Sequence, residues 1–416
     1  MAKAKPTLRQ IEWADLEIGV LIHYLAEIYN PDFKAYKTSA VRTELSPDKF
    51  NPSSLDPEQW VRSAYEAGAK YAILVANHCT GFSLWQTKVN DYSCASMSWK
   101  NGEGDILREF IDACKKYGLK PGVYYSTGCN GYYNINDEEK QDYTSEKYKN
   151  YVKCVEEQVK ELWSEYGELF EIWFDGGIIP TEKGGPNLVP LLKKYQPNAI
   201  TFQGPEDWQN NIRWVGNENG LAPENCWSSV KNGENSLSGN PDGELWRPAE
   251  TDMPNRSNES FGGGWAWREN EEHFVFSPEH LLECYVNSVG RNSNLLLGMA
   301  ISRDGSFEDE EQFISFGKLL KQTFSAPLVK TSGCKTRFEL CLEKETALKY
   351  LVICEDISNG HNVRSFSISA DGKTVYRGEC IGHKLIIPLN SIKAKNVTVQ
   401  IEKYDEIPVI KCAELF

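Results

Sequence analysis

The stretch Phe170-Glu171-Ile172-Trp173-Phe174-Asp175-Gly176-Gly177 combines a predicted buried strand with an acidic residue at its end. Phe, Ile and Trp suit a strand that is covered on both faces. The two glycines permit a sharp turn, since they carry no Cβ atom. A carboxylate at the C-terminal end of such a strand lies where α/β sheets and barrels place their catalytic groups. The alternative is that Asp175 is a loop residue that caps the next element.

Strand-like and helical segments alternate on both sides of this stretch, up to about residue 330. Six further strands are predicted at 17–24, 71–76, 121–126, 199–203, 212–215 and 295–299. Five helices are predicted at 56–68, 105–116, 143–166, 278–289 and 308–324. Repeated strand–helix pairs indicate right-handed βαβ crossovers and a parallel sheet. About eight such pairs predict an α/β fold at 1–330, a TIM-like (β/α)₈-type barrel rather than an open doubly wound sheet.

Two regions depart from this alternation. Residues 204–276 are rich in Gly, Asn, Pro and Trp, and a long irregular segment inside a compact domain is usually a functional loop. Residues 333–416 contain turns such as Ala370-Asp371-Gly372-Lys373 between short alternating runs, at 349–354, 364–369 and 396–401. That pattern predicts a small C-terminal antiparallel β-sandwich.

The composition excludes several kinds of partner. The net charge of −14 argues against a nucleic-acid partner or an anionic membrane, because both require clustered Lys and Arg. No stretch approaches 18 consecutive apolar residues, the length at which a membrane span is expected. The chain contains 12 Trp, 20 Tyr and 17 Phe, whose flat faces form either core or surfaces on which sugar rings stack. A neutral substrate is compatible with this negative net charge and with the many aromatic residues.

The twelve cysteines are scattered between Cys79 and Cys412, with no Cys-x-x-Cys pair and no metal-like spacing with His. We therefore expect no metal site and no cofactor. Scattered thiols are typical of an intracellular protein, and the start Met1-Ala2-Lys3-Ala4-Lys5-Pro6 precedes no apolar run of a signal peptide. These features predict a cytoplasmic protein. Removal of a secretory leader, which would make the protein secreted or periplasmic, leaves the same pattern.

Several predicted barrel strands end in polar side chains. These ends are His23, Asn77-His78, Tyr124-Tyr125, Asp175 and Arg213-Trp214-Val215-Gly216-Asn217-Glu218. A single His on a strand is more often a satisfied core residue. Because the C-terminal ends of barrel strands share one face, five such ends indicate one pocket.

Two carboxylates on one face, among Tyr and Trp, indicate glycoside hydrolysis. Asp175 is the predicted nucleophile, because a short side chain on a rigid strand keeps its oxygens in place. Glu218 is the predicted acid/base, since its longer side chain lies on a Gly-rich loop. Glu250, in Trp246-Arg247-Pro248-Ala249-Glu250-Thr251-Asp252, is the alternative acid. Aromatic residues of the 204–276 loops are candidate walls for the leaving group, namely Trp208, Trp214, Trp227, Trp246, Trp265 and Trp267.

At these residues the chain resembles the α-L-fucosidases of glycoside hydrolase family twenty-nine, over the barrel and the C-terminal sandwich. The matching segments are Ile22-His23, Tyr71-Ala72-Ile73-Leu74-Val75-Ala76-Asn77-His78-Cys79-Thr80-Gly81-Phe82-Ser83-Leu84-Trp85, Gly122-Val123-Tyr124-Tyr125-Ser126, Trp173-Phe174-Asp175-Gly176-Gly177 and Ser288-Val289-Gly290-Arg291-Asn292-Ser293-Asn294-Leu295-Leu296-Leu297. The resemblance implies a retaining exo-glycosidase that releases terminal L-fucose by double displacement, with a fucosylated oligosaccharide or glycoconjugate as substrate.

The resemblance also implies roles for particular residues. Asp175 matches the family's nucleophile, and His23 and His78 match its fucose-binding histidines. The segment 213–218 resembles the acid/base segment of the branch that prefers branched α-1,3/1,4-linked fucosides. We expect substrate contacts from His23, His78, Tyr124, Tyr125, Trp85, Arg213, Trp214 and Glu44.

The chain departs from the family pattern at two places. Cys79 and Thr80 stand where the family has a second His and an Asp, and a thiol is a weaker hydrogen-bonding group than an imidazole. In the loop after the first strand, Glu44 is the only remnant of the family's Glu-Trp pair. One alternative is therefore an exo-glycosidase for another sugar, such as an α-L-galactoside. The other is a catalytically inactive sugar-binding barrel.

Overall fold

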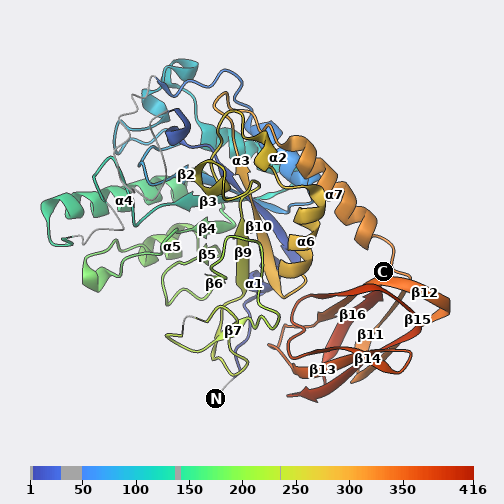
Figure 1. Cartoon of the computed structure of the whole chain (residues 1–416). Helices are drawn as coiled ribbons and strands as arrows, with labels where there is room; N and C mark the ends of the chain where they lie inside the picture. Colours follow the sequence, from blue (N-terminus) through green and yellow to red (C-terminus); the bar gives the residue numbers. More distant parts are fainter. Residues whose placement is uncertain (1–2, 30–48, 136–141, 235) are drawn as a thin grey trace.

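The structure is a computed structural model that describes residues 3–29, 49–135, 142–234 and 236–416. Eight parallel strands close into a barrel, and a separate antiparallel sheet follows toward the C-terminus (Figure 1). Around the barrel the strands follow the order β1 (Ile18–His23), β10 (Ser293–Ala300), β9 (Ala249–Met253), β6 (Asn211–Trp214), β5 (Ile200–Phe202), β4 (Glu171–Trp173), β3 (Lys120–Tyr125) and β2 (Tyr71–Asn77). This confirms the predicted (β/α)₈-type barrel.

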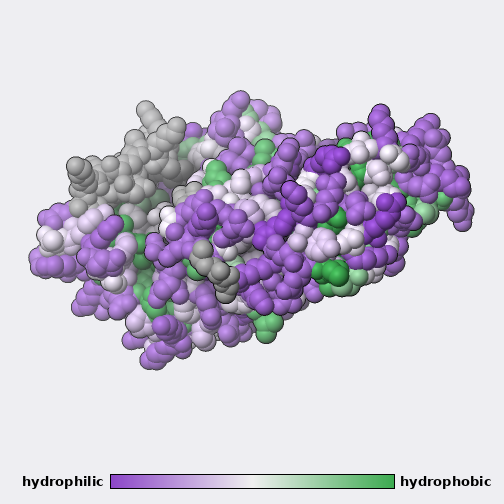
Figure 2. Space-filling model, turned by 90° about the horizontal axis from the view of Figure 1, so that it is seen from below, coloured by the Kyte–Doolittle hydropathy of each residue, from purple (hydrophilic) through white to green (hydrophobic). Residues whose placement is uncertain are grey.

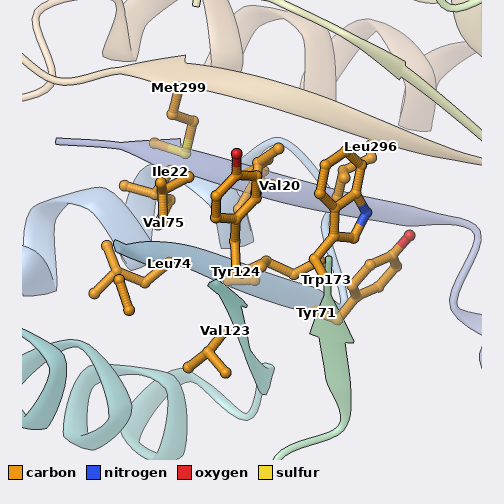
Figure 3. Packing of buried hydrophobic residues seen from close by; sticks show 14 of the residues in the cluster. Val20, Ile22, Tyr71, Leu74, Val75, Val123, Tyr124, Trp173, Leu296 and Met299 are labelled. Atoms are coloured by element: carbon orange, nitrogen blue, oxygen red, sulfur yellow. The ribbon is translucent and has the colours of Figure 1, made fainter. Parts of the chain in front are cut away.

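The barrel interior is filled by side chains from its own strands. Tyr71 of β2, Tyr124 of β3 and Leu296 of β10 are buried among these interior side chains (Figure 3). Gly19 makes room for the ring of Tyr71, because a Cβ atom at position 19 would lie only 2.2 Å from that ring. The barrel is therefore a packed core, and only its rim is available for a site.

One barrel strand, β9, was not predicted from the sequence. Its residues Ala249-Glu250-Thr251-Asp252-Met253 are all buried, and the strand pairs with β10 and β6. Two acids and a Thr interrupt the continuous apolar run by which buried strands are recognised. The strand forms in the interior because other barrel residues donate hydrogen bonds to both acids.

The five predicted helices are all present, as α2 (Pro57–Glu66), α3 (Ile106–Tyr117), α4 (Glu146–Glu165), α6 (Pro278–Ser288) and α7 (Glu310–Phe324). Two unpredicted helices are α1 (Leu8–Leu16) and the short α5 (Val189–Tyr195). Thr7 and Gln10 form a capping box that starts α1. Trp13 of α1 is buried, and its carbonyl accepts from the Asn294 side chain on β10. This helix therefore covers the end of the barrel at which the strands begin.

Short 3₁₀ helices and a two-stranded hairpin lie in the connecting loops. The 3₁₀ helices are η1 (Ala26–Tyr29), η4 (Cys94–Ser96), η5 (Trp99–Gly102), η6 (Thr181–Lys183), η7 (Phe261–Gly264) and η8 (Glu272–Phe274). The hairpin pairs β7 (Ser229–Val230) with β8 (Leu245–Trp246). Of these segments, η1 reaches the rim, where Glu27 contacts His78, whereas the Trp246 carbonyl of β8 accepts from Gln10 of α1 at the other end of the barrel.

The C-terminal unit is antiparallel throughout, as predicted, and has its own hydrophobic core. Its strands are β11 (Val329–Cys334), β12 (Arg337–Glu355), β13 (Val363–Ala370), β14 (Lys373–Gly378), β15 (Leu385–Tyr404) and β16 (Val409–Leu415). The long strands β12 and β15 contain register shifts, which bend the sheet over its own core. An ion pair between Lys384 and Glu17 links this β-sandwich to the barrel.

Polar residues dominate the surface. Figure 2 shows hydrophilic residues over most of one face, with hydrophobic residues in small separate patches. Among the helices of the described ranges, none has both the length and the apolar character that a membrane crossing requires.

Candidate active site

Polar side chains from several barrel strands meet at the rim where these strands end. His23 ends β1, His78 follows β2, and their ring centroids lie 6.3 Å apart. The ring of His78 stacks on that of Tyr124, with centroids 5.7 Å apart. The Tyr124 hydroxyl donates a 2.8 Å hydrogen bond to Oδ2 of Asp175, which follows β4. These contacts form one continuous wall from β1 to β4.

The wall continues from His23 in the other direction. Trp265 lies against His23, with ring centroids 5.0 Å apart. The Trp265 indole Nε1 lies 3.4 Å from Oε2 of Glu218. Asp175 and Glu218 are therefore connected by a continuous row of contacting side chains, and we call the barrel mouth that this row borders the candidate pocket.

Asp175 is an exposed carboxylate on a fixed backbone. Gly176 and Gly177 both adopt left-handed conformations, with φ of 71° and 77°, so the chain turns sharply directly after Asp175. The Tyr124 hydroxyl holds one carboxylate oxygen, and the other is available to a ligand. This geometry suits a nucleophile, because the attacking oxygen is exposed while its neighbour is anchored.

His23 presents a neutral imidazole to the pocket. Its Nδ1–H donates to the carbonyl of Leu21, 3.2 Å away, which leaves Nε2 as an acceptor. Burial and the charge of His78 lower the pKa of His23 to about 3. At neutral pH this neutral ring is able to accept a hydrogen bond at Nε2.

His78 has the opposite character. Its Nδ1 lies 3.0 Å from Oε1 of Glu27, a buried residue of η1. Burial opposes protonation of His78, but Cys79, the hydrogen bond to Glu27 and the charges of Glu27 and Asp175 outweigh it and raise the pKa to about 9. His78 is therefore a cationic donor at neutral pH. Glu27 was not anticipated, because no strand or helix pattern marks its segment.

Glu218 lies on a loop that is fastened to β9 at both ends. The Val215 amide donates to the Glu250 carbonyl and the Gly220 amide to the Asp252 carbonyl, each at 3.1 Å. Glu218 itself has a φ of 50°, a left-handed conformation that costs a non-glycine residue on the order of 1 kcal/mol or more. Such strain is typical of functional positions. The carboxylate is exposed at the rim, as a proton donor to a leaving group requires.

Asp252 is a third carboxyl group of this region that the sequence did not reveal. Asp252 lies near the C-terminal end of β9 and is only 3% exposed. Its Oδ1 accepts a 2.7 Å hydrogen bond from Nε1 of Trp214. Burial raises its pKa to about 7, helped by the charges of Glu218 and Glu250 and opposed by the Trp214 hydrogen bond. The half-buried Trp214 ring is thereby held beside the Glu218 loop.

Several predicted site residues lie elsewhere. Tyr125 is buried and donates to Gln158 of α4, outside the barrel wall, so its assignment to the substrate site is wrong. Trp85 is likewise buried and donates to Glu161. Glu44 falls outside the described residues.

Two further assignments are corrected. The Arg213 guanidinium donates to the carbonyls of Leu237 and Trp227, so it anchors a loop rather than contacting substrate. Glu250, the alternative acid, is fully buried inside the barrel instead of at its rim. Of the six loop tryptophans, Trp214 and Trp265 border the pocket, whereas the remaining four are buried, namely Trp208, Trp227, Trp246 and Trp267.

The two departures from the family pattern also have defined surroundings. The Cys79 carbonyl accepts from the Gly131 amide, and the Sγ of Cys129 lies 3.7 Å from the same oxygen. The hydrogen bond with Cys129 and burial raise the pKa of the Cys79 thiol well above its usual range, and the charge of His78 opposes this rise. Thr80 is buried and accepts from the Phe82 amide. Within the described ranges, no cluster of three or more His, Cys, Asp or Glu is suited to hold a metal ion.

Comparisons with known proteins point to one family. The sequence model of the family described as Alpha-L-fucosidase matches residues 6–322. Alpha-L-fucosidase 1 of Arabidopsis thaliana is 28% identical over 472 residues, covering 99% of this chain and 87% of the plant protein. A crystal structure of a candidate alpha-L-fucosidase from Bacteroides thetaiotaomicron is 32% identical, with a TM-score of 0.92 and coverage of 99% of each chain.

A glycoside hydrolase 29 family member from an unknown rumen bacterium is 30% identical, with a TM-score of 0.85 over all of this chain and 77% of that one. The family match covers most of the chain and includes every barrel strand. The chain therefore belongs to the alpha-L-fucosidase family and is a glycoside hydrolase.

Proposed function

We propose that this protein is an α-L-fucosidase that hydrolyses terminal α-L-fucosides with retention of configuration. The observation that carries this proposal is the unbroken row of side chains linking Asp175 to Glu218 around one pocket. Retaining glycosidases need one carboxylate as nucleophile and a second carboxyl group that acts first as acid and then as base. These two residues supply that pair.

The proposed reaction has two steps. Asp175 attacks the anomeric carbon while Glu218 protonates the departing oxygen, and a glycosyl–enzyme ester forms. Glu218, now a carboxylate, then removes a proton from a water molecule that attacks the same carbon and releases the sugar and free Asp175. The neutral His23 and the cationic His78 offer the sugar hydroxyls one acceptor and one donor.

The leaving-group side supports a preference for branched α-1,3/1,4-linked glycans. Trp214 lies beside the Glu218 loop and is fixed by Asp252, so a flat apolar face borders the position of the departing sugar. A branched glycan presents a second sugar that such a face can contact.

Initial rates on a panel of fucosides test both statements. We expect kcat/KM for α-1,3/1,4-linked fucosyl-oligosaccharides to exceed that for α-1,2 and α-1,6 linkages by about tenfold or more, as one well-placed sugar–aromatic contact provides. An aryl α-L-galactoside, included because of Cys79, is expected to be the poorer aryl substrate. Faster hydrolysis of the galactoside than of the aryl fucoside would assign the enzyme to the other sugar. Calorimetric binding of fucose without hydrolysis of any fucoside would indicate a sugar-binding barrel.

The charge state of His78 predicts a dependence on pH. His78 keeps its proton below pH about 9 and loses it above, so the cationic donor is present at neutral pH and disappears in alkali. We expect KM for an aryl fucoside to rise by about three- to tenfold above pH 9, the loss expected when a charged hydrogen bond to substrate is removed. In Glu27→Gln the rise should begin at lower pH, because the carboxylate that favours the proton is gone. A KM that is flat through pH 10 in both proteins would show that His78 does not bind substrate as a cation.

A further inference from the structure

Two glutamates lie deep inside the barrel, below the pocket. Glu171 of β4 and Glu250 of β9 are both 0% exposed. Trp13 Nε1 donates to Oε2 of Glu171 at 2.9 Å. Glu250 accepts at both oxygens, from the Tyr71 hydroxyl at 2.7 Å and from Trp173 Nε1 at 3.0 Å. Neither glutamate takes part in the proposed reaction.

The two carboxyl groups lie close enough to hydrogen-bond to each other, which is possible only if one of them carries a proton. Oε1 of Glu171 receives no hydrogen bond from the described residues, so it is the atom free to carry that proton toward Glu250. Burial raises the pKa of Glu171 well above its usual range, and the charge of Glu250 adds to this effect. Burial also raises the pKa of Glu250, to about 7, although hydrogen bonds from Trp173, Tyr71 and Glu171 oppose the rise. The donors therefore favour a protonated Glu171 and an ionised Glu250.

Glu250 is connected to the pocket through Trp173. The Trp173 ring lies between its strand neighbours, stacked on Phe202 at 3.8 Å and on Tyr124 at 5.5 Å between ring centroids. Figure 3 shows the indole nitrogen of Trp173 and the hydroxyl of Tyr71 directed to the same side, where Glu250 accepts from both. Tyr124 in turn donates to Asp175.

We propose that Glu250 is a positioning residue for the nucleophile, and that it acts through Trp173 and Tyr124 on Asp175. The inference rests on the proposed function, because it concerns the geometry of the same reaction. The indole N–H fixes the rotation of the Trp173 ring, which supports the Tyr124 ring. The Tyr124 hydroxyl then holds the Asp175 carboxylate where it attacks. A shift of this carboxylate by about 1 Å is enough to cost up to about 100-fold in rate.

The two glutamates can be separated by one conservative substitution at each. Glu171→Gln reproduces the protonated acid, since its amide nitrogen donates to Glu250 and its oxygen accepts from Trp13. Glu250→Gln keeps only one acceptor oxygen for two donors, so either Tyr71 or Trp173 loses its partner. We expect Glu250→Gln to lower kcat for an aryl fucoside by about 10- to 100-fold with KM within about threefold, and Glu171→Gln to change kcat by less than about threefold.

A third variant keeps the test decisive if Glu250→Gln folds poorly. Trp173→Phe retains the ring and removes only the N–H donor, and should show the same fall in kcat. The kcat of the double variant Glu250→Gln/Trp173→Phe should fall no further than that of the slower single variant, because both changes remove the same interaction. A wild-type kcat in Trp173→Phe, additive losses in the double variant, or equal losses in the two glutamine variants would overturn the proposal.

A readout that needs no substrate separates this inference from the proposed function. The infrared difference spectrum of the wild type minus Glu171→Gln at neutral pH should show the band of a protonated carboxyl group. A carboxylate band in its place would contradict the assigned proton. If the wild type hydrolyses no fucoside, the proposed function fails, whereas the infrared result still decides the state of the buried pair.

Discussion

Asp175→Asn and Asp175→Ala should reduce kcat for an aryl α-L-fucoside by at least about 1,000-fold, a loss of about 4 kcal/mol in transition-state stabilisation. Asparagine has nearly the same shape as aspartate and can still accept from Tyr124, so the loss comes from the missing negative charge and not from a change in packing. Initial rates with an aryl fucoside measure this directly. Near-normal turnover by Asp175→Asn would overturn the proposed mechanism.

The matched control for Asp175 is Tyr124→Phe, which removes the hydroxyl that holds the carboxylate but leaves the stacked ring in place. The kcat of this variant for the aryl fucoside should fall by about tenfold, the effect expected when one hydrogen bond to a charged group is removed. Azide added to Asp175→Ala should restore part of the rate, because the shortened side chain leaves room for a small anion. The product would then be the glycosyl azide of inverted configuration, since the azide attacks the sugar directly in one displacement.

The rim positions of Asp175, His23 and His78 were predictable because these residues end or follow strands with strong apolar runs. Ile73, Leu74 and Val75 precede His78 by a few residues, and Ile172, Trp173 and Phe174 lead directly to Asp175. In each case the run marks a buried strand and its last residue marks the rim. The barrel itself followed from the same signal, repeated along the chain.

Adjacent positions at a strand end were harder to assign. Successive side chains on a strand point to opposite faces, so Tyr124 faces the interior while Tyr125 faces α4. The sequence shows where the strand ends, but it does not show which of the two adjacent side chains faces the barrel interior. Arg213 and Trp214 show the same ambiguity, because Arg213 binds loop carbonyls and Trp214 borders the pocket.

Strand β9, with its two buried acids, was missed for a different reason. Polar residues inside a barrel are stable only when distant residues donate to them, and those donors come from other strands. Tyr71 and Trp173 satisfy Glu250, and Trp214 satisfies Asp252, but no local pattern connects these pairs in the sequence. Trp265 and Glu27 likewise reach the pocket from loops whose path depends on the whole fold.

Glu218→Ala should produce a loss that depends on the leaving group. For a fucosyl-oligosaccharide, whose leaving oxygen needs a proton, we expect kcat/KM to fall by about 1,000-fold, in the middle of the range for general acid catalysis. For a dinitrophenyl fucoside, whose leaving group departs without protonation, the first step should be nearly unaffected. The second step still needs a base, so the fucosyl–enzyme ester should accumulate and appear as a burst of dinitrophenolate. Rapid-mixing absorbance measurements and mass spectrometry of the quenched enzyme detect both effects.

Asp252→Asn is the control that decides between the two rim carboxyls. The asparagine oxygen can still accept from Trp214, so the loop that carries Glu218 should remain in place. One Asp252 oxygen accepts from the Trp214 indole, and the residue is only 3% exposed. We therefore expect kcat/KM of Asp252→Asn to fall by about threefold, and by a similar factor for the oligosaccharide and for the dinitrophenyl fucoside. Azide should accelerate the second step in Glu218→Ala and give a glycosyl azide of retained configuration, and should have no such effect on Asp252→Asn. If the leaving-group dependence and the azide effect belonged to Asp252→Asn instead, Asp252 would be the acid/base and Glu218 an exposed loop residue.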